Sequence, residues 1–234
     1  MAGETTIAAI FDFDGTLFRG HLWQGLMKCH IKHKVKLPSV IAFLSTHIML
    51  SLFGEVAAKL RIVRPEAHKI RWGEDLATLL KGFSKEEGLR IFEWISDNYF
   101  MKLARPDTMA LLGHHKSKGH VTVLISGSFS DFLETIRQKI GVDYAVGTEL
   151  EVIDNVYSGR IIRPLCFGVN KVRLLNSFFS QAELEVDLGQ SFAYADSIVD
   201  APMLEMVGRP VAVYPDKHLL IMARRKGWYI VPQL

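Results

Sequence analysis

The spacing of apolar residues changes twice along the chain. Residues 7–11, Ile-Ala-Ala-Ile-Phe, form a short uncharged run that predicts a buried strand of a parallel sheet. From Arg19 to about Leu103 the apolar positions recur with helical spacing instead, and we find no strand pattern there. The helices expected in this segment cover residues 21–34, 39–61, 65–80 and 85–102. Ser84 and Glu87, three residues apart, have the form of a capping box at the start of the last one.

An alternation of strands and helices returns at Arg105. The expected strands are 120–125, 143–147, 191–194 and 210–213. The expected helices are 106–118, a segment ending at about 139, 170–179, 201–206 and 217–226. Residues 149–162 alternate around Asp154-Asn155 and Ser158-Gly159 and predict a small β-hairpin. This order predicts an α/β fold with a parallel sheet and right-handed crossovers, and the helical insertion after the first strand is expected to form a cap on it.

One segment of the expected cap is unusually apolar. Leu37 to Gly54 contains no Asp, Glu, Lys or Arg. It is slightly shorter than a membrane span, which needs about 20 residues. We expect a helix buried in the cap. The alternative is a surface that dips into a bilayer or receives an acyl chain, which would give peripheral membrane contact through residues 37–54.

Composition and charge narrow the class of protein. The 234 residues have a formal net charge of +3 and no block of basic residues, which argues against nucleic-acid binding. The two cysteines, Cys29 and Cys166, lie far apart and match no metal-binding spacing, so we expect reduced thiols. The first residues contain no basic region and no apolar signal segment. A cytoplasmic location is therefore expected.

Two carboxylates follow the first strand. Asp12 and Asp14 lie two residues apart, where an ideal strand would direct both to one face, and Gly15 and Thr16 then turn the chain. Two acids in such a place are costly unless a cation or a proton-transfer task holds them. One carboxylate could attack phosphorus, and the other could protonate the leaving oxygen and later deprotonate water.

Three further loops contain groups that phosphoryl transfer needs. The hydroxyl and backbone N–H groups of Ser126-Gly127-Ser128 could form an anion cradle at a helix start. Lys171, near another helix start, could offset the charge of the transferring group. Asp196 and Asp200 could bind a hard cation, for which Mg²⁺ is the expected cofactor.

This set of motifs, in this order, resembles the haloacid dehalogenase superfamily of phosphohydrolases. A helical insertion directly after the first motif is similar to the subfamily (IB) that contains phosphoserine phosphatase. The resemblance implies a Rossmann-like core with a C1-type cap, in which residues 1–18 and 105–234 form the core domain and residues 19–104 the cap domain. The resemblance also implies that Asp12 is the nucleophile and that Asp14 is the general acid and base. It implies that the Asp12 carboxylate, the Asp14 backbone carbonyl and Asp196 bind Mg²⁺, and that Asp200 orients the metal-bound water. Phosphoryl oxygens would be bound by Ser126, Gly127 and Lys171.

Two departures from the phosphoserine phosphatase pattern concern the substrate. Those enzymes carry a Glu nine residues after the nucleophile, where it meets the ammonium group of the substrate, and this chain has His21 there. Val199 stands before Asp200 where they have Asn. Both differences weaken the case for phosphoserine, and His21 becomes a candidate for contact with the leaving group.

The sequence therefore predicts a Mg²⁺-dependent phosphomonoester phosphatase that acts through an aspartyl-phosphate on a small phosphorylated substrate, phosphoserine-like or a sugar phosphate. One alternative is a lipid-phosphate phosphatase of the phosphatidylglycerophosphate or lysophosphatidate type, motivated by the apolar cap. Another is a phosphotransferase, which shares the first half-reaction. A binding module without activity is the hypothesis from a different class, and the intact set of acidic and basic residues argues against it.

Other polar and aromatic residues are expected to have structural or solvent-exposed roles. The paired histidines lack a third metal ligand and are expected at the surface: His30 with His33, and His114 with His115. The cap arginines are expected to be solvated, with contact to a substrate anion as the alternative: Arg61, Arg64 and Arg71. The cap tryptophans are expected to pack between helices: Trp23, Trp72 and Trp94.

Overall fold

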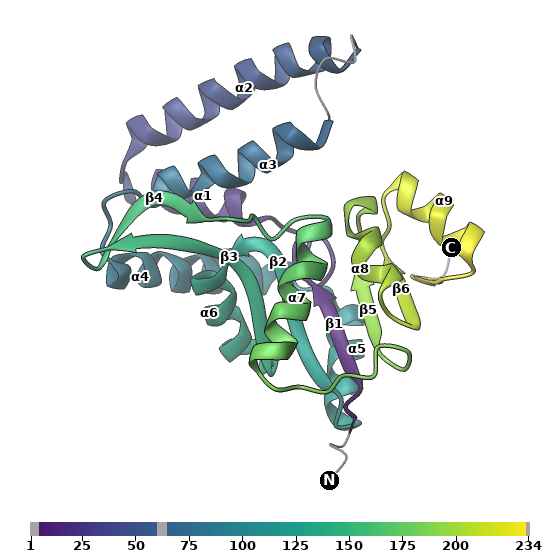
Figure 1. Ribbon diagram of the computed structural model, residues 1–234. Coiled ribbons are helices and arrows are strands. Elements are labelled where there is room, and N and C mark those ends of the chain that lie inside the picture. Colours follow the sequence, from purple (N-terminus) through teal and green to yellow (C-terminus); the bar gives the residue numbers. More distant parts are fainter. Residues whose placement is uncertain (1–4, 60–64, 233–234) are drawn as a thin grey trace.

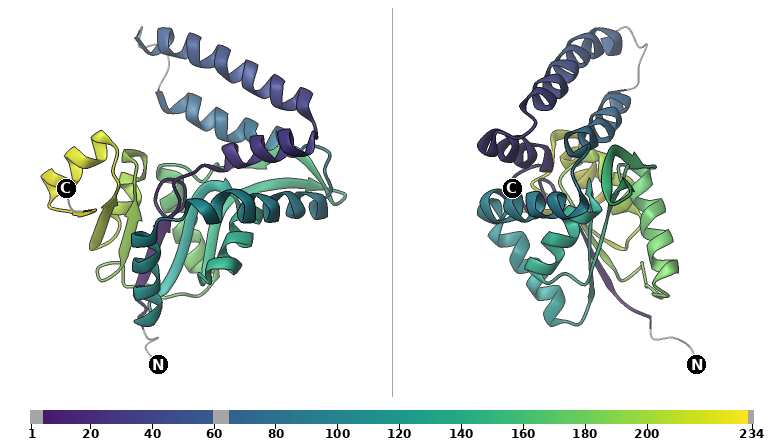
Figure 2. Two further views of the ribbon diagram at one scale, coloured as in Figure 1. Left: turned by 180° about the vertical axis from the view of Figure 1, so that it is seen from behind. Right: turned by 90° about the vertical axis from the view of Figure 1, so that its left-hand side faces the viewer.

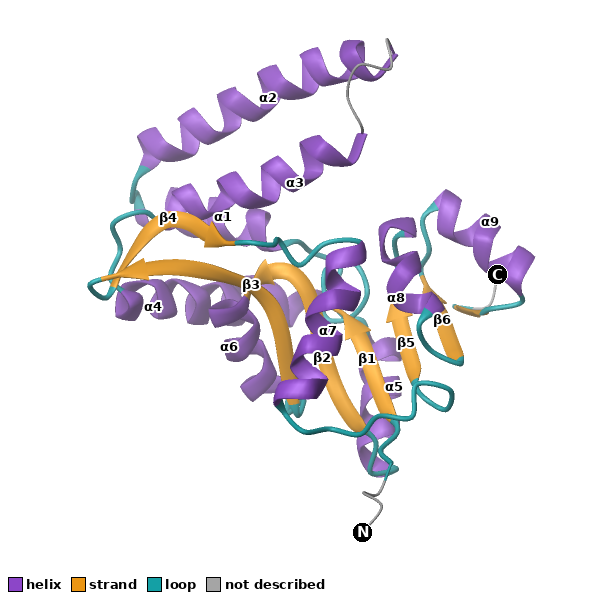
Figure 3. Cartoon of the chain, viewed as in Figure 1, coloured by secondary structure: helices purple, strands orange, loops and turns teal. Residues whose placement is uncertain are grey.

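The computed structural model describes residues 5–59 and 65–232, without the side chains of residues 50–59 and 65–67. A seven-stranded sheet in the order β4-β3-β2-β1-β5-β6-β7 forms its centre (Figures 1 and 3). The strands are β1 (Ala8–Asp12), β2 (Val121–Phe129), β3 (Tyr144–Ile153), β4 (Val156–Ile162), β5 (Phe192–Ala195), β6 (Arg209–Val213) and β7 (Tyr229–Val231). All neighbours are parallel except β3 and β4. The predicted α/β fold is confirmed, and β7 is a strand that the sequence pattern did not reveal.

Strand β1 lies in the middle of the sheet and is buried on both faces. Its side chains alternate between two hydrophobic clusters, because successive residues of a strand point to opposite faces. Ala9 and Phe11 pack toward α5 (Pro106–Ser117) and α6 (Ser130–Ile140). Ala8 and Ile10 pack toward α7 (Val169–Gln181), α8 (Ala201–Glu205) and α9 (Lys217–Lys226). Helices therefore cover both faces, which explains why the strand reads as a continuous apolar run.

The expected helices between β1 and α5 are present among the described residues, and positions 60 and 61 of the predicted helix 39–61 lie outside them. They are α1 (Leu22–His33), α2 (Leu37–Lys59), α3 (Pro65–Asp75) with a 3₁₀ extension (Leu76–Leu80), and α4 (Lys85–Ile95) with a π-helical turn (Ser96–Phe100) and a 3₁₀ turn (Met101–Leu103). The capping box is confirmed, since the Glu87 N–H donates to Ser84 Oγ and the Ser84 N–H donates to the Glu87 carboxylate. Figure 3 shows α2 and α3 on one side of the hairpin formed by β3 and β4, and α4 on its other side, next to α6.

The predicted hairpin is also confirmed, and it ties the helical segment to the sheet. Asp154 and Asn155, at its turn, both have positive φ. The outer strand β4 exchanges backbone hydrogen bonds with the loop before α4: the Tyr157 N–H donates to the Phe83 carbonyl at 2.9 Å, and the Gly82 N–H donates to the Tyr157 carbonyl at 2.8 Å. The insertion thereby occupies one edge of the sheet.

Helix α2 is buried on one side only. Val40, Phe43 and His47 are buried against α3, where the Trp72 ring lies 4.9 Å from Phe43 and 4.6 Å from His47 between ring centroids. Figures 1 and 2 show α2 as the outermost helix, with α3 between it and the sheet. The expectation of a fully buried helix is wrong for its outer side, where Ile41 is 66% exposed. Among the described residues, no helix is long and apolar enough to cross a membrane.

Two histidines expected at the surface are buried. His30 places its ring nitrogens 2.8 Å from the Leu26 carbonyl and 3.1 Å from the Leu79 carbonyl. His115 lies beneath the sheet, with Nε2 2.6 Å from the Tyr194 hydroxyl. Both rings have hydrogen-bond partners inside the protein, and these offset the desolvation cost of burying them. The two cysteines are buried free thiols, as expected.

Candidate active site

The four loops chosen from the sequence meet at one cavity of about 320 Å³ beyond the carboxyl ends of β1, β2 and β5. β1 directs Asp12 into it, and the turn after β1 contributes Asp14. The remaining predicted residues in its lining are His21, Ser126, Gly127, Lys171, Asp196 and Asp200. This is the edge of an open α/β sheet where ligands bind, because the loops diverge there on either side of the central strands.

Lys171 joins two of the acids. Its Nζ lies 2.6 Å from Asp12 Oδ1 and 2.7 Å from Asp200 Oδ1, and all three side chains are buried. Burial lowers the pKa of Lys171, but the two carboxylates outweigh that effect and raise it above the usual lysine value. Burial raises the pKa of Asp12, and Lys171 opposes the rise. The lysine therefore stays charged and holds the Asp12 carboxylate in place.

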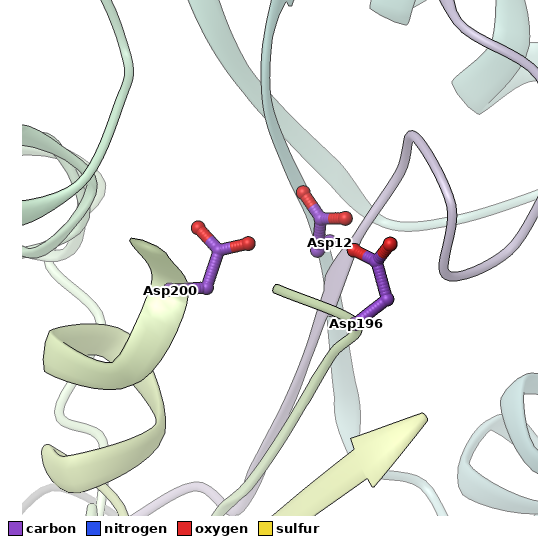
Figure 4. Close-up of side chains that lie close together, drawn as sticks. All are labelled: Asp12, Asp196 and Asp200. Atoms are coloured by element: carbon purple, nitrogen blue, oxygen red, sulfur yellow. The ribbon is translucent and has the colours of Figure 1, made fainter. Parts of the chain in front are cut away.

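Asp196 completes a cluster of three carboxylates. One oxygen from each of Asp12, Asp196 and Asp200 lies within 4.8 Å of the others, and Figure 4 shows the three side chains facing a common space. Burial, reinforced by the neighbouring acids, raises the pKa of Asp196 to about 8. One lysine cannot neutralise three clustered carboxylates, two of them buried, so the donor set fits a hard divalent cation with oxygen ligands.

Asp14 has different partners from Asp12. Its Oδ2 accepts hydrogen bonds from the Ser126 and Ser128 hydroxyls, each at 2.8 Å, and its Oδ1 accepts one from the Leu22 N–H at 3.1 Å. His21 Nδ1 lies 4.0 Å from the same Oδ1. The Asp14 carboxylate is therefore separate from the acidic cluster. Ser128 belongs to the segment predicted as an anion cradle, but its hydrogen bond to Asp14 was not predicted.

Gly15 allows the first loop to approach the fourth. Its φ of +90° is a conformation that L side chains rarely adopt, and a Cβ added there would lie 2.1 Å from Asp196 Oδ2. Arg105 fixes the same turn by donating from Nε to the Gly15 carbonyl at 2.9 Å. The glycine is therefore required by the position of Asp196.

Asp216 organises the fourth loop, and the sequence analysis did not identify it. Its side chain accepts from the Ser197 hydroxyl at 3.0 Å, from the Ile198 N–H at 2.9 Å and from the Leu219 N–H at 2.8 Å. Its own N–H donates to the Asp196 carbonyl at 2.7 Å. The residue caps α9 and at the same time holds the loop between Asp196 and Asp200.

The helical segment forms the other wall of the cavity. His21, Trp23, Lys69 and Trp72 line it, together with the apolar residues Leu22 and Leu76. Trp23 and Trp72 meet edge to face at 5.7 Å, so they both pack, as expected, and face the cavity. Lys69 is the cation that the sequence analysis missed. Arg71 pairs with Asp75 instead, and Arg61 and Arg64 lie outside the described residues.

Comparisons with known proteins identify the family of this chain. Residues 9–205 match the family model of the haloacid dehalogenase-like hydrolases, and the chain belongs to that family. A phosphoserine phosphatase of Mycobacterium tuberculosis is 29% identical over 232 residues, covering 97% of this chain and 71% of the relative. A histidinol-phosphatase of Neisseria meningitidis is 29% identical over 154 residues, covering 65% of this chain and 69% of the relative.

Solved structures show the same fold. A protein of unknown function from Bordetella pertussis superposes with a TM-score of 0.81 at 22% identity, covering 97% of this chain and 99% of that one. The sheet and its helices are thus the Rossmann-like core of this family, and the expected family resemblance is confirmed.

Proposed function

We propose that this phosphoric monoester hydrolase transfers the phosphoryl group of a small phosphomonoester to the Asp12 carboxylate and then to water. The observation that carries the proposal is the buried Asp12 carboxylate, held by Lys171 beside Asp196 and Asp200 at a cavity. A carboxylate fixed by a charge-assisted hydrogen bond is positioned for in-line attack. Because its conformational entropy is already lost on folding, orienting it adds nothing to the activation barrier.

A Mg²⁺ ion would be held by the carboxylates of Asp12 and Asp196 and the backbone carbonyl of Asp14, with Asp200 orienting its water shell, and when bound it would neutralise phosphoryl charge. Lys171 would stabilise charge that develops on the transferring group. The Ser126 hydroxyl and the Gly127 N–H would bind the phosphoryl oxygens, for which Ser126 must turn from the Asp14 carboxylate toward the substrate.

Asp14 would supply the proton chemistry. It would protonate the departing alkoxide as the O–P bond breaks and Asp12 forms the acyl phosphate. The same carboxylate would then remove a proton from water as water attacks phosphorus, which regenerates Asp12 and releases phosphate. The Leu22 N–H and the Ser128 hydroxyl would keep the Asp14 side chain directed toward the leaving group.

The domain division follows from the same proposal. Residues 1–18 and 105–234 would form the catalytic core, and residues 19–104 a cap that closes over the substrate and opens to release product. The cap contributes the Lys69 ammonium group and the His21 imidazole to the described cavity lining, and no carboxylate. A leaving group with an ammonium ion would lack a partner there, which favours sugar phosphates and other leaving groups without positive charge over phosphoserine.

A lipid phosphate is a second candidate substrate, supported by the aromatic cavity wall of Trp23 and Trp72 and the exposed apolar side of α2. Activity on micellar phosphatidylglycerophosphate or lysophosphatidate above that on sugar phosphates would select it. A phosphotransferase shares the first half-reaction, and transfer of phosphate to an added alcohol in place of water would identify that activity.

The test of the proposed function is the Asp12→Asn variant with p-nitrophenyl phosphate. It should lower kcat by at least about a thousandfold, because an amide cannot form the acyl phosphate. Acid quenching of the wild-type reaction should trap phosphate on Asp12, and EDTA should abolish turnover until Mg²⁺ is added. Asp97→Asn, a matched change at a residue whose side chain is 57% exposed, should keep wild-type activity. Near-normal turnover by Asp12→Asn would overturn the assignment.

A further inference from the structure

Between Leu37 and Met49, where its side chains are described, the exposed side of α2 carries no charged residue, and no described element covers it. Its exposed residues recur with helical spacing and form one face, here called the α2 outer face: Ile41, Ala42, Ser45, Thr46, Ile48 and Met49. Ile41, Ile48 and Met49 are 66%, 59% and 52% exposed. The exposed face of a helix in water normally carries charged side chains, so an uncharged apolar stripe of this kind marks a contact surface.

The chain around this face is strongly basic. From Gly15 to Gly54 there is no Asp or Glu, whereas the segment contains Arg19, Lys28, Lys32, Lys34 and Lys36. The whole chain has 28 basic and 25 acidic side chains, so the rest of it holds more acids than bases. Positive charge is thus concentrated on α1 and the residues on either side of it, next in the chain to the helix that carries the apolar stripe.

Three of these lysines are exposed beside further apolar residues. Lys28, Lys32 and Lys34 lie on α1 and its end, and the first two place Nζ 4.4 Å from the Tyr99 ring centroid and 5.2 Å from the Trp94 ring centroid. Among the described residues none of the three forms an ion pair with a carboxylate. Ile31 and Val35, which alternate with them, are 59% and 37% exposed. Basic and apolar side chains therefore reach solvent together immediately before α2 begins.

We infer that the α2 outer face docks on the surface of an anionic lipid bilayer, with the neighbouring lysines of α1 at the headgroups. Such a surface supplies both negative charge and an apolar layer, and a helix that lies in its plane buries one side only. At 23 residues α2 is about 34 Å long and suits that orientation. A second copy of the chain would instead bring two positive surfaces together.

Docking would place the candidate active site near the lipid surface. Trp72 packs against Phe43 and His47 on the inner side of α2 and also lines the catalytic cavity. The docking itself uses no catalytic residue and does not rest on the proposed function. Loss of membrane binding and loss of phosphatase turnover can therefore be measured independently.

The test is flotation of this 234-residue chain with vesicles of phosphatidylcholine and phosphatidylglycerol in equal parts, compared with vesicles of phosphatidylcholine alone. The protein should float with the anionic vesicles only, and salt should weaken the binding. The double variant Ile41→Gln/Ile48→Gln should lower the partition coefficient about tenfold or more, and Lys32→Glu/Lys34→Glu should do the same.

Matched controls lie on α9, at the other side of the sheet. Ile221 is 58% exposed, close to the value for Ile48, so Ile221→Gln should leave flotation unchanged, as should Arg224→Glu/Arg225→Glu. Asp12→Asn should float like the wild type even though it cannot turn over. The inference is overturned if the wild type stays with the soluble fraction, if the α2 variant floats equally well, or if that variant instead abolishes a concentration-dependent dimer.

Discussion

Lys171 Nζ lies 2.6 Å from Asp12 Oδ1 although the two residues are 159 positions apart in the chain. Neither side chain is more than 6% exposed, so the ion pair has almost no contact with water. A buried pair of this kind is costly to break, because removing one partner leaves the other charge without compensation. The pair therefore links the proposed catalytic site to the stability of the fold.

Replacing Lys171 by Met should reduce both properties. Asp12 and Asp200 would face each other without a cation, so the free energy of unfolding should fall by about 3–5 kcal/mol and kcat by about a hundredfold or more. Urea denaturation and p-nitrophenyl phosphate hydrolysis measure the two effects. Lys139→Met removes a more exposed pair with Asp97 and should cost no more than about 1 kcal/mol. Equal costs for the two variants would contradict the role of burial.

Gly15→Ala should displace Asp196. The new methyl group would meet the carboxylate at 2.1 Å in a backbone conformation with φ of +90°, and we expect a loss of about 1–3 kcal/mol together with a marked rise in the Mg²⁺ concentration needed for activity. Gly113→Ala is the matched change, because a Cβ on that α5 residue meets nothing within 4 Å. It should be stabilising by about 0.5–1 kcal/mol with unchanged metal dependence. Metal titrations and thermal unfolding of both variants decide the matter.

Asp216→Ala should act through the loop that Asp216 holds. Loss of the α9 cap should cost about 1 kcal/mol, and release of Ser197 and Ile198 should raise the Mg²⁺ concentration for half-maximal activity about tenfold. Asp187→Ala removes a comparable turn-capping carboxylate, which accepts from the Gln190 N–H, in a loop that holds no site residue. That variant should lose stability without a change in metal dependence. A similar metal shift in both would refute the positioning role.

Stability should fall in mild acid because of His115. Burial, aided by the nearby His120, lowers the pKa of His115 from 6.5 to about 4. Between these two values the unfolded chain binds a proton that the folded chain does not, so the contribution of His115 to stability is complete above about pH 6.5 and is lost as the pH falls toward 4. His115→Gln should flatten this part of the pH profile in urea denaturation.

The polar motifs could be read from the sequence because their positions are set locally. An apolar strand followed by Asp12 places that acid at the carboxyl end of the sheet, whatever else the chain does. Lys171 was found only through the order of the motifs, since a lysine near a helix start is ordinarily solvated. Asp216 could not be distinguished from any other acid before a helix, because its second task depends on a loop about 20 residues away in the chain.

The burial of His30 and His115 is visible in the helical spacing of the sequence. His30 follows Leu22 and Leu26 at intervals of four, and these positions form one buried stripe on α1. Thr108, Leu112 and His115 have the equivalent spacing on α5. Helical periodicity therefore indicated burial for both histidines. For Lys69 and Trp72 no such signal exists, since the packing of α3 against the core decides which of its sides meets the cavity.

The backbone pairing between β4 and the loop before α4 has a consequence for how this chain can be cut. The Phe83 carbonyl and the Gly82 N–H pair with the backbone N–H and carbonyl of Tyr157, which point away from β3. The insertion therefore takes the place of a further strand at the β4 edge of the sheet. An engineered core without residues 19–104 would present those groups to solvent, ready to recruit other chains. The inserted segment beside the candidate active-site cavity thus also keeps this edge strand from pairing with other chains.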